Sequence, residues 1–343
     1  MSGRTLVVLA LAAALAVAAA WYVRRPPEPP APATASELFL PGLAERLADV
    51  ESLRVRVAGG QLLARVERDG DGWRVANRHG YPADRETLRG TLIALAEARR
   101  LAPKTDRPEG WPRLGVGPVE AADATGVELR LGGLEPPPRI VIGETAAGDA
   151  NGTYVRRVGE GERAWLISES IDRPDEIADW LDDTLVDVST RRLRKVTLQP
   201  RDGDPVEIGR GGASGTDLRI TNRPEGRRPL SPSIARSLAR IVAGLELDDV
   251  HPAASTDAPP VLSTARFATF GGLTITIEAL AAERGGAPRY IRLRAEAAEG
   301  AADAIRQEAE RINARVANWL YEIPEYKFVN LTQTLEGVLE PPR

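Results

Sequence analysis

The sequence predicts an α+β protein in which an N-terminal transmembrane helix precedes two similar units of antiparallel sheet, each with helices packed on one face. Three observations support this prediction. An apolar run lies near the N-terminus, stretches of alternating apolar and polar residues are followed by amphipathic helical stretches, and this pattern occurs twice. We expect an anchor at 1–25, a proline-rich linker at 26–36, a first unit at 37–186 and a second unit at 187–343.

The anchor is predicted from the run Leu6–Val23, which contains only Leu, Val, Ala, Trp and Tyr. Eighteen helical residues span about 27 Å, close to the roughly 30 Å hydrocarbon core of a bilayer. Trp21 and Tyr22 at its end are typical of the headgroup level. The run therefore indicates a single-pass membrane protein.

A cleaved signal peptide is the alternative for the same segment. Arg4, the apolar run and the small residues Ala18-Ala19-Ala20 fit a signal peptide cleaved before Trp21, after which the chain would be secreted. The positive-inside rule is nearly balanced, with Arg4 on one side and Arg24 and Arg25 on the other. Because long domains are exported largely regardless of their charge, we expect the remainder of the chain outside the cytoplasm.

Composition removes several classes of function. The 45 basic and 49 acidic residues give a net charge of −4. Residues 1–25 hold three arginines and no acid, which leaves 42 basic against 49 acidic groups beyond them. This balance predicts neither a nucleic-acid partner nor binding to anionic lipid. The absence of cysteine excludes disulfides, thiolate metal sites and a cysteine nucleophile.

Pro26–Ala33, rich in proline, predicts a stiff spacer about 25 Å long between the anchor and the first unit. Period-two alternation then predicts strands. In the first unit these are Leu53–Val57, Leu62–Glu67, Trp73–Ala76, Val127–Leu131, Arg139–Ile142, Thr153–Arg157 and Ala164–Ile167. In the second they are Lys195–Gln199, Val206–Ile208, Leu218–Asn222, Leu273–Leu280 and Tyr290–Ala295.

Two helices are expected in each unit. Asp84 predicts the N-cap of a helix with Leu88, Leu92 and Leu95 on one face, and a second helix is expected at Asp175–Leu181. In the second unit, Ser231-Pro232 predicts a helix start. The apolar stripe after it consists of Ile234, Leu238, Ile241, Val242 and Leu245. A long helix is expected at Ala301–Tyr321, with the stripe Ile305, Ala309, Ile312, Val316, Trp319 and Leu320.

Two pairs of short motifs indicate an internal duplication. Asp49-Val50 and Asp187-Val188 are 138 residues apart, and Ala178–Leu181 and Ala317–Leu320 are 139 apart. The nearly equal offsets suggest two copies of one unit. Whether the two sheets are separate or continuous is open at this point.

Residues that could carry chemistry are better explained as structural. His79 and His251 are 172 residues apart and flank turns, so loop histidines are favoured over a shared metal site. Asp69-Gly70-Asp71-Gly72 lacks the later ligands of a calcium loop and is interpreted as a hairpin turn. The glycine-rich stretch 209–215 lacks the lysine and following helix of a phosphate loop, and a flexible hairpin loop is favoured.

Acidic and aromatic residues near the predicted helix 175–181 are interpreted in the same way. Asp179 and Asp183, with Asp182 beside them, could suggest a glycosidase pair, but a solvated helix face is favoured. The tryptophans Trp165, Trp180 and Trp319 are expected to pack in the core rather than to bind sugars. We therefore predict no catalytic, cofactor-binding or metal-binding residues and expect no cofactor.

The order of several short motifs resembles bacterial proteins of the domain of unknown function 4340 family. The motifs are Leu40–Leu43, Asp71–Val75, Tyr81–Asp84, Gly152–Arg156, Ala178–Leu181 and Trp319–Pro324. The resemblance covers about residues 5–335 and implies a membrane-anchored envelope protein, often encoded beside gliding-motility-type ABC transporter components. It brings no catalytic residues with it.

The leading functional expectation is a non-enzymatic accessory or scaffold protein, anchored in the bacterial inner membrane with its ectodomain in the periplasm. ABC transporter membrane subunits are the expected partners, and no nucleic acid is expected. The alternatives are an envelope binding module for glycan, lipid or peptide and, third, a hydrolase. An aromatic-lined concavity would favour the binding module, and clustered ionisable groups in a pocket would favour the hydrolase.

Overall fold

The computed structural model describes residues 37–147, 152–159, 161, 163–210, 217–254, 259–281 and 289–341. The predicted anchor at 1–25 and linker at 26–36 lie outside these ranges, as do residues 211–215 of the glycine-rich stretch. No helix within the described ranges has the length and apolarity needed to span a bilayer.

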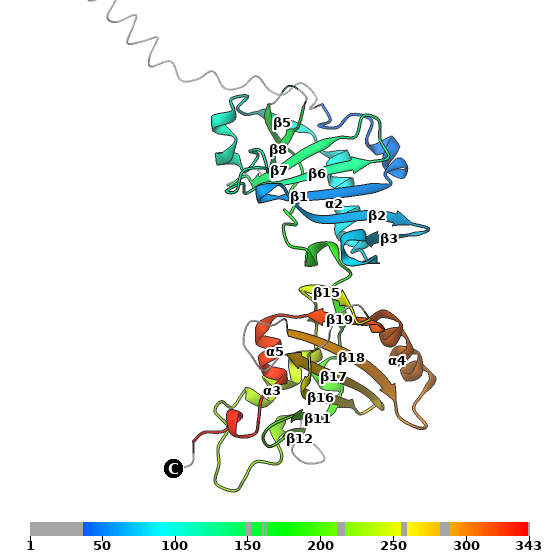
Figure 1. Cartoon of the computed structure of the whole chain (residues 1–343), viewed down its shortest axis with the longest axis vertical. Coiled ribbons are helices and arrows are strands. Elements are labelled where there is room, and N and C mark those ends of the chain that lie inside the picture. The colour runs from blue at the N-terminus through cyan, green and yellow to red at the C-terminus, as the bar shows by residue number, and fades with distance from the viewer. Residues whose placement is uncertain are drawn as a thin grey trace, which may run out of the picture.

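The first unit is built on a nine-stranded antiparallel sheet in the order β4-β3-β2-β1-β6-β7-β8-β9-β5 (Figure 1). Its strands are β1 (Ser52–Val57), β2 (Gln61–Asp69), β3 (Gly72–Val75), β4 (Tyr81–Pro82), β5 (Arg100–Pro103), β6 (Val127–Gly132), β7 (Arg139–Thr145), β8 (Thr153–Arg157) and β9 (Ala164–Ile167). The 3-10 helix η1 (Ala44–Asp49) precedes β1, η2 (Ala58–Gly60) lies between β1 and β2, and η3 (Ala76–Arg78) lies between β3 and β4.

Helix α2 (Arg85–Glu97) covers one face of this sheet and lies behind it in Figure 1. Its N-cap is Asp84, as predicted, whose carboxylate accepts hydrogen bonds from the amides of Glu86 and Thr87. The buried side chains of the helix and of alternate strand positions, among them Leu88 and Leu53, form one apolar cluster. On the opposite face, η4 (Pro108–Gly110), η5 (Pro112–Leu114) and the following residues cover the β7–β9 side through a separate small cluster. Residues 119–121 reach back to β1 and η2, where Glu120 pairs with Arg56.

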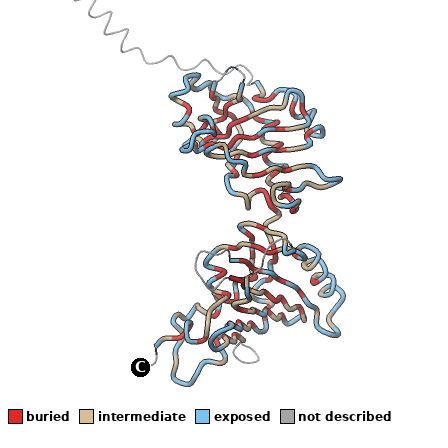
Figure 2. The backbone as a smooth tube through the Cα atoms, in the orientation of Figure 1, coloured by how far each residue is buried: buried red, intermediate tan, exposed pale blue. Residues whose placement is uncertain are grey.

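The second unit contains an eight-stranded antiparallel sheet in the order β13-β12-β11-β16-β17-β18-β19-β15. Its strands are β11 (Leu193–Pro200), β12 (Val206–Arg210), β13 (Leu218–Ile220), β15 (Asp249–Pro252), β16 (Val261–Thr269), β17 (Leu273–Ala281), β18 (Arg289–Ala297) and β19 (Trp319–Glu322). The helices are η7 (Thr190–Arg192), α3 (Ile234–Ala239), η8 (Arg240–Val242), α4 (Asp303–Val316), α5 (Glu325–Leu331) and η9 (Glu336–Val338). Buried side chains of α3, α4 and α5 join the apolar side of the sheet, and Figure 2 shows buried positions concentrated in both sheets.

The two sheets are separate and share one strand order. Strands β1–β3 and β5–β9 have counterparts β11–β13 and β15–β19 in the same places, and β4 is an addition at one edge. Asn77, which follows β3, bonds the carbonyl of Leu63 and the amide of Arg65 on β2. Asn222, which follows β13, bonds the carbonyl of Pro205 and the amide of Glu207 in the same way, and these two residues are also two positions apart. The common order agrees with the predicted pair of similar units, whereas the boundary between 186 and 187 stays a prediction.

One predicted helix is largely absent, and another is shorter than predicted. Only the short 3-10 helix η6 (Ala178–Trp180) forms within Asp175–Leu181, because Leu181 is extended and bridges to Ala83 of the first sheet. The long helix predicted at Ala301–Tyr321 ends at Val316, where the chain turns through Asn318 at a φ of 71° and continues as β19.

The predicted helix start at Ser231-Pro232 and the predicted stripe also need correction. The helix α3 begins at Ile234 and makes no side-chain cap, and Leu245 belongs to the two-residue strand β14 (Leu245–Glu246). Of the two motif pairs that suggested duplication, Ala178–Leu181 and Ala317–Leu320 are not equivalent. The first follows β9, whereas the second leads into β19, the counterpart of β9.

Candidate functional site

The two sheets meet at a junction in which side chains from both units interlock. The segment after β9 leaves the first sheet through η6 and continues as β10 (Thr184–Val186). Strand β10 pairs with β14, so this segment is held by the second unit as well. The amide of Asp84 donates to the carbonyl of Trp180, and the amide of Asp182 donates to the carbonyl of Pro82. The connection is therefore hydrogen-bonded on both sides.

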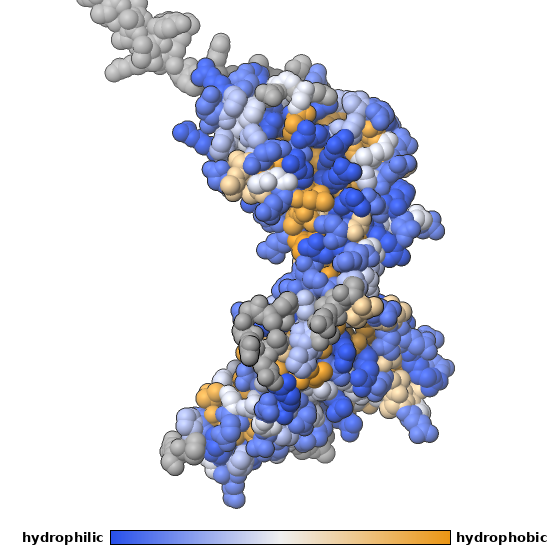
Figure 3. Space-filling view, in the orientation of Figure 1, coloured by the Kyte–Doolittle hydropathy of each residue, from blue (hydrophilic) through white to orange (hydrophobic). Residues whose placement is uncertain are grey.

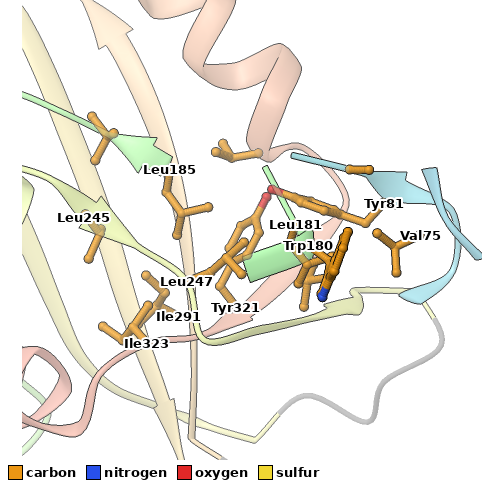
Figure 4. Close-up of a cluster of buried hydrophobic side chains, with 14 of the residues drawn as sticks. Val75, Tyr81, Trp180, Leu181, Leu185, Leu245, Leu247, Ile291, Tyr321 and Ile323 are labelled. Atoms are coloured by element: carbon orange, nitrogen blue, oxygen red, sulfur yellow. The ribbon is translucent and has the colours of Figure 1, made fainter. Parts of the chain in front are cut away.

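Aromatic side chains form the centre of the junction. Tyr81, on β4 of the first sheet, is 1% exposed. Its ring meets that of Trp319 edge-on at 5.1 Å and that of Tyr321 at 6.2 Å, both on β19 of the second sheet. Figure 4 shows Tyr81 and Tyr321 pointing toward one another, with Trp180 beside them. The buried apolar cluster consequently runs without a break from one unit into the other.

The tyrosine hydroxyls of the junction are structural groups. The Tyr81 hydroxyl donates to the carbonyl of Asp182 at 3.2 Å. Burial raises the pKa of Tyr81 to about 12, an effect opposed by its hydrogen bond with Tyr321. Burial likewise raises the pKa of Tyr321, and the neighbouring Tyr81 adds to this shift. Both hydroxyls thus stay protonated at neutral pH and are unsuited to act as general bases.

An ion pair closes one side of the junction. Arg78, in η3, donates from Nε and Nη2 to the two carboxylate oxygens of Asp249 on β15, at 2.6 and 3.0 Å. The two side chains are only 26% and 20% exposed. Arg315, at the end of α4, donates to the carbonyl of Thr184 at 2.6 Å and lies 3.8 Å from the Asp182 carboxylate. The bidentate geometry of the Arg78–Asp249 pair fixes the orientation of both side chains, so this ion pair resists rotation of one sheet against the other.

Carboxylates at the rim of the junction are partly desolvated. Burial raises the pKa of Asp183, and the nearby carboxylates of Glu246, Asp84 and Asp182 add to the shift, while a hydrogen bond from Thr184 opposes it. Burial also raises the pKa of Asp179, whose side chain accepts from the amide of Glu176.

These aspartates do not form the polar helix face that the sequence suggested. Asp179 belongs to the short η6, Asp183 lies beyond it, and each has separate partners. Within the described residues, no three histidine, cysteine, aspartate or glutamate side chains are placed to hold a metal ion.

The other residues singled out in the sequence are dispersed. His79 lies in a left-handed turn with φ of 56°, and His251 Nε2 lies 2.9 Å from the carboxylate of Glu322. Asp69 and Gly72 face each other at the end of the β2–β3 hairpin, so the predicted turn is confirmed. Trp180 is fully buried in the core.

Trp165 and Trp319, the other two tryptophans expected to pack in the core, are partly buried and pack against it. The junction itself was not predicted from the sequence. The sequence feature that could have indicated it is the presence of aromatic residues in Tyr81-Pro82 and in Trp319-Leu320-Tyr321. Aromatic residues alone do not show that the two segments are in contact.

A groove of about 590 Å³ lies beside the junction. It is lined mainly by charged residues of the β2–β3 hairpin and the start of α2, together with Asp182. Five acidic and two basic side chains line it, and the Asp69 carboxylate already accepts from Arg74. The groove therefore has the character of a solvated surface rather than of an apolar ligand pocket.

Comparison with known proteins finds a matching family. A family model described as Domain of unknown function (DUF4340) matches residues 73–263, which include most of the first unit, the junction segment and the first strands of the second unit. Neither a curated protein nor a solved structure matches the chain.

Proposed function

The chain belongs to the DUF4340 family, and from this premise we propose that it is a non-enzymatic scaffold held in the bacterial inner membrane by Leu6–Val23. In this proposal residues 37–343 face the periplasm and serve as an accessory to the membrane subunits of an ABC transporter. The spacer Pro26–Ala33 keeps the first sheet away from the headgroups.

The junction is the observation that carries the proposal. A scaffold must hold its contact surfaces at a defined separation, and inter-domain motion is the default where an interface is small and polar. Here the bidentate pair of Arg78 with Asp249, the edge-on aromatic contacts of Tyr81 and the continuous apolar cluster oppose such motion. Arg78, Asp249 and Tyr81 are engaged in contacts between the two units, which supports a structural role for them.

Co-purification from gently solubilised membranes tests the partnership. The full chain, tagged after Arg343, should remain with the membrane and should bring down ABC transporter membrane subunits. A matched control replaces Leu6–Val23 by an unrelated transmembrane segment. Because recognition is assigned to the ectodomain, this control should retain the same partners.

Two results would count against the proposal. Repeated recovery of the chain without any transporter subunit would remove the partnership. Release of the mature protein into the soluble periplasm, beginning at Trp21, would remove the anchor and favour the cleaved signal peptide.

A further inference from the structure

Four arginines form one cross-strand row on the open face of the nine-stranded sheet. Register places Arg65 on β2 opposite Arg54 on β1, Arg54 opposite Arg130 on β6, and Arg130 opposite Arg139 on β7. Adjacent strands lie about 4.8 Å apart, so the row extends over about 14 Å. This face is turned away from α2, and Figure 3 shows hydrophilic side chains on this side of the first unit with apolar patches between them.

The two outer arginines of the row have acidic partners. Arg65 and Arg139 lie 3.0 and 2.8 Å from carboxylate oxygens of Glu67 and Glu128. The two central arginines are exposed and make no ion pair or side-chain hydrogen bond within the described part of the chain. Like charges directly opposite one another destabilise a sheet. Because Arg54 and Arg130 have no acidic partner among the described residues, the centre of the row carries two positive charges that are not neutralised.

Two small residues lie beside the central pair. Ser52 and Gly132 are cross-strand neighbours on the same face, two residues from Arg54 and Arg130 along their strands. A Cβ atom on Gly132 would lie 2.3 Å from the Ser52 Oγ, so the hydroxyl fills the place that a side chain at position 132 would take. The Ser52 hydroxyl therefore lies on the same face as the two guanidinium groups and can donate to a group that they bind.

The fold itself does not require the arginines. Asn77 accepts from the amide of Arg65, and Asn222 accepts from the amide of Glu207 on β12. Arg65 and Glu207 are therefore equivalent positions in the two sheets. The rest of that row in the second sheet is Thr197, Arg266 and Thr276, so a single exposed arginine lies between two threonines. The same strand order thus forms without a run of like charges, and the row in the first sheet calls for a reason other than folding.

We propose that Arg54 and Arg130 together bind the phosphate group of a soluble phosphomonoester, with the Ser52 hydroxyl as a further donor. Such a group carries a charge of about −1.5 to −2 near neutral pH, which matches the two unneutralised guanidinium groups. Guanidinium forks bind phosphate through paired, charge-assisted hydrogen bonds. A ligand with a single carboxylate would neutralise only one of the two guanidinium charges. The site is independent of any transporter partner.

Titration calorimetry of the full chain in detergent tests the site, with glycerol phosphate and inorganic phosphate as probes at low ionic strength. Saturable binding is expected for the wild type. The double variant Arg54→Gln/Arg130→Gln should bind at least about tenfold more weakly, since it loses charge-assisted hydrogen bonds. The matched control Arg266→Gln should bind like the wild type. Without phosphate, the double variant should be at least as stable as the wild type, because the repulsion is removed.

Three outcomes would overturn the proposal. One is the absence of saturable phosphate binding by the wild type. Another is an equal loss of affinity in Arg266→Gln, which would indicate non-specific charge attraction. The third is binding to vesicles containing phosphatidic acid, or to an acidic peptide, without binding to glycerol phosphate.

Discussion

Asn77 and Asn222 make the same two hydrogen bonds at the same place in the two sheets. Each side-chain amide donates to one backbone carbonyl and accepts from the amide two residues further along the neighbouring strand, at 2.8 to 3.0 Å. The agreement fixes which residues of the two units correspond, beyond the common strand order.

We expect Asn77→Ala and Asn222→Ala to destabilise the protein by similar amounts. Each leaves two half-buried backbone groups without partners, at a cost of about 1–3 kcal/mol. Urea denaturation of the full chain measures this, with the exposed Gln61→Ala as a control that should stay within about 0.5 kcal/mol of wild type. A large effect in one unit and none in the other would contradict the equivalence.

Loss of the ion pair at the junction should weaken the contact between the units. Arg78→Ala removes two charge-assisted hydrogen bonds and should cost about 1.5–3 kcal/mol of stability. Arg74→Ala, which removes an exposed pair with Asp69, serves as the control and should cost about 0–1 kcal/mol. In the double variant Arg78→Ala/Asp249→Ala the losses should be less than additive. Full additivity would show that the two groups do not interact.

The aromatic contact should depend on the ring more than on the hydroxyl of Tyr81. Tyr81→Ala empties a buried aromatic position and should cost about 3–5 kcal/mol, as other large-to-small core changes do. Tyr81→Phe keeps the ring and loses the bond to the Asp182 carbonyl, which should cost about 0.5–1.5 kcal/mol. Thermal unfolding distinguishes the two variants. Equal losses would assign the effect to the hydroxyl.

Asp183 should make stability depend on pH. Because its pKa is raised in the folded state, the fold favours the protonated form, and this contribution is lost as pH rises through the folded pKa. Asp183→Asn should therefore raise Tm at pH 7, and the gain should vanish below the unfolded pKa of about 3.9. The exposed Asp123→Asn is the control. A gain for Asp183→Asn that is the same at all pH values would rule out titration as its cause.

The sequence predicted the regular parts of the fold well where apolar residues alternate. Strand β16 was missed although it lies in the middle of its sheet, since its buried positions include small or polar residues such as Ser263 and Thr269. Ser263 is accommodated by a bond to the carbonyl of Leu331, a partner 68 residues away. The helix predicted to continue to Tyr321 was too long because only Asn318, with its positive φ, marks the break.

The junction and the arginine row could not be inferred from composition. The arginines lie on four different strands, and the net negative charge of the chain gives no indication of a local basic row. Tyr81 and Tyr321 are distant in sequence and carry no motif that links them. Both features depend on register and on the packing of whole units, which residue patterns within one segment do not encode.

The most direct test of the rigid junction is a distance measurement between the units. Because the chain has no cysteine, Arg89→Cys on α2 and Arg311→Cys on α4 allow spin labels to be placed at two exposed helical sites. Pulsed electron–electron double resonance on the spin-labelled full chain should give one narrow distance distribution. The distribution should broaden when Arg78→Ala and Tyr81→Ala are added. A distribution that is already broad in the otherwise wild-type protein would contradict the rigid scaffold.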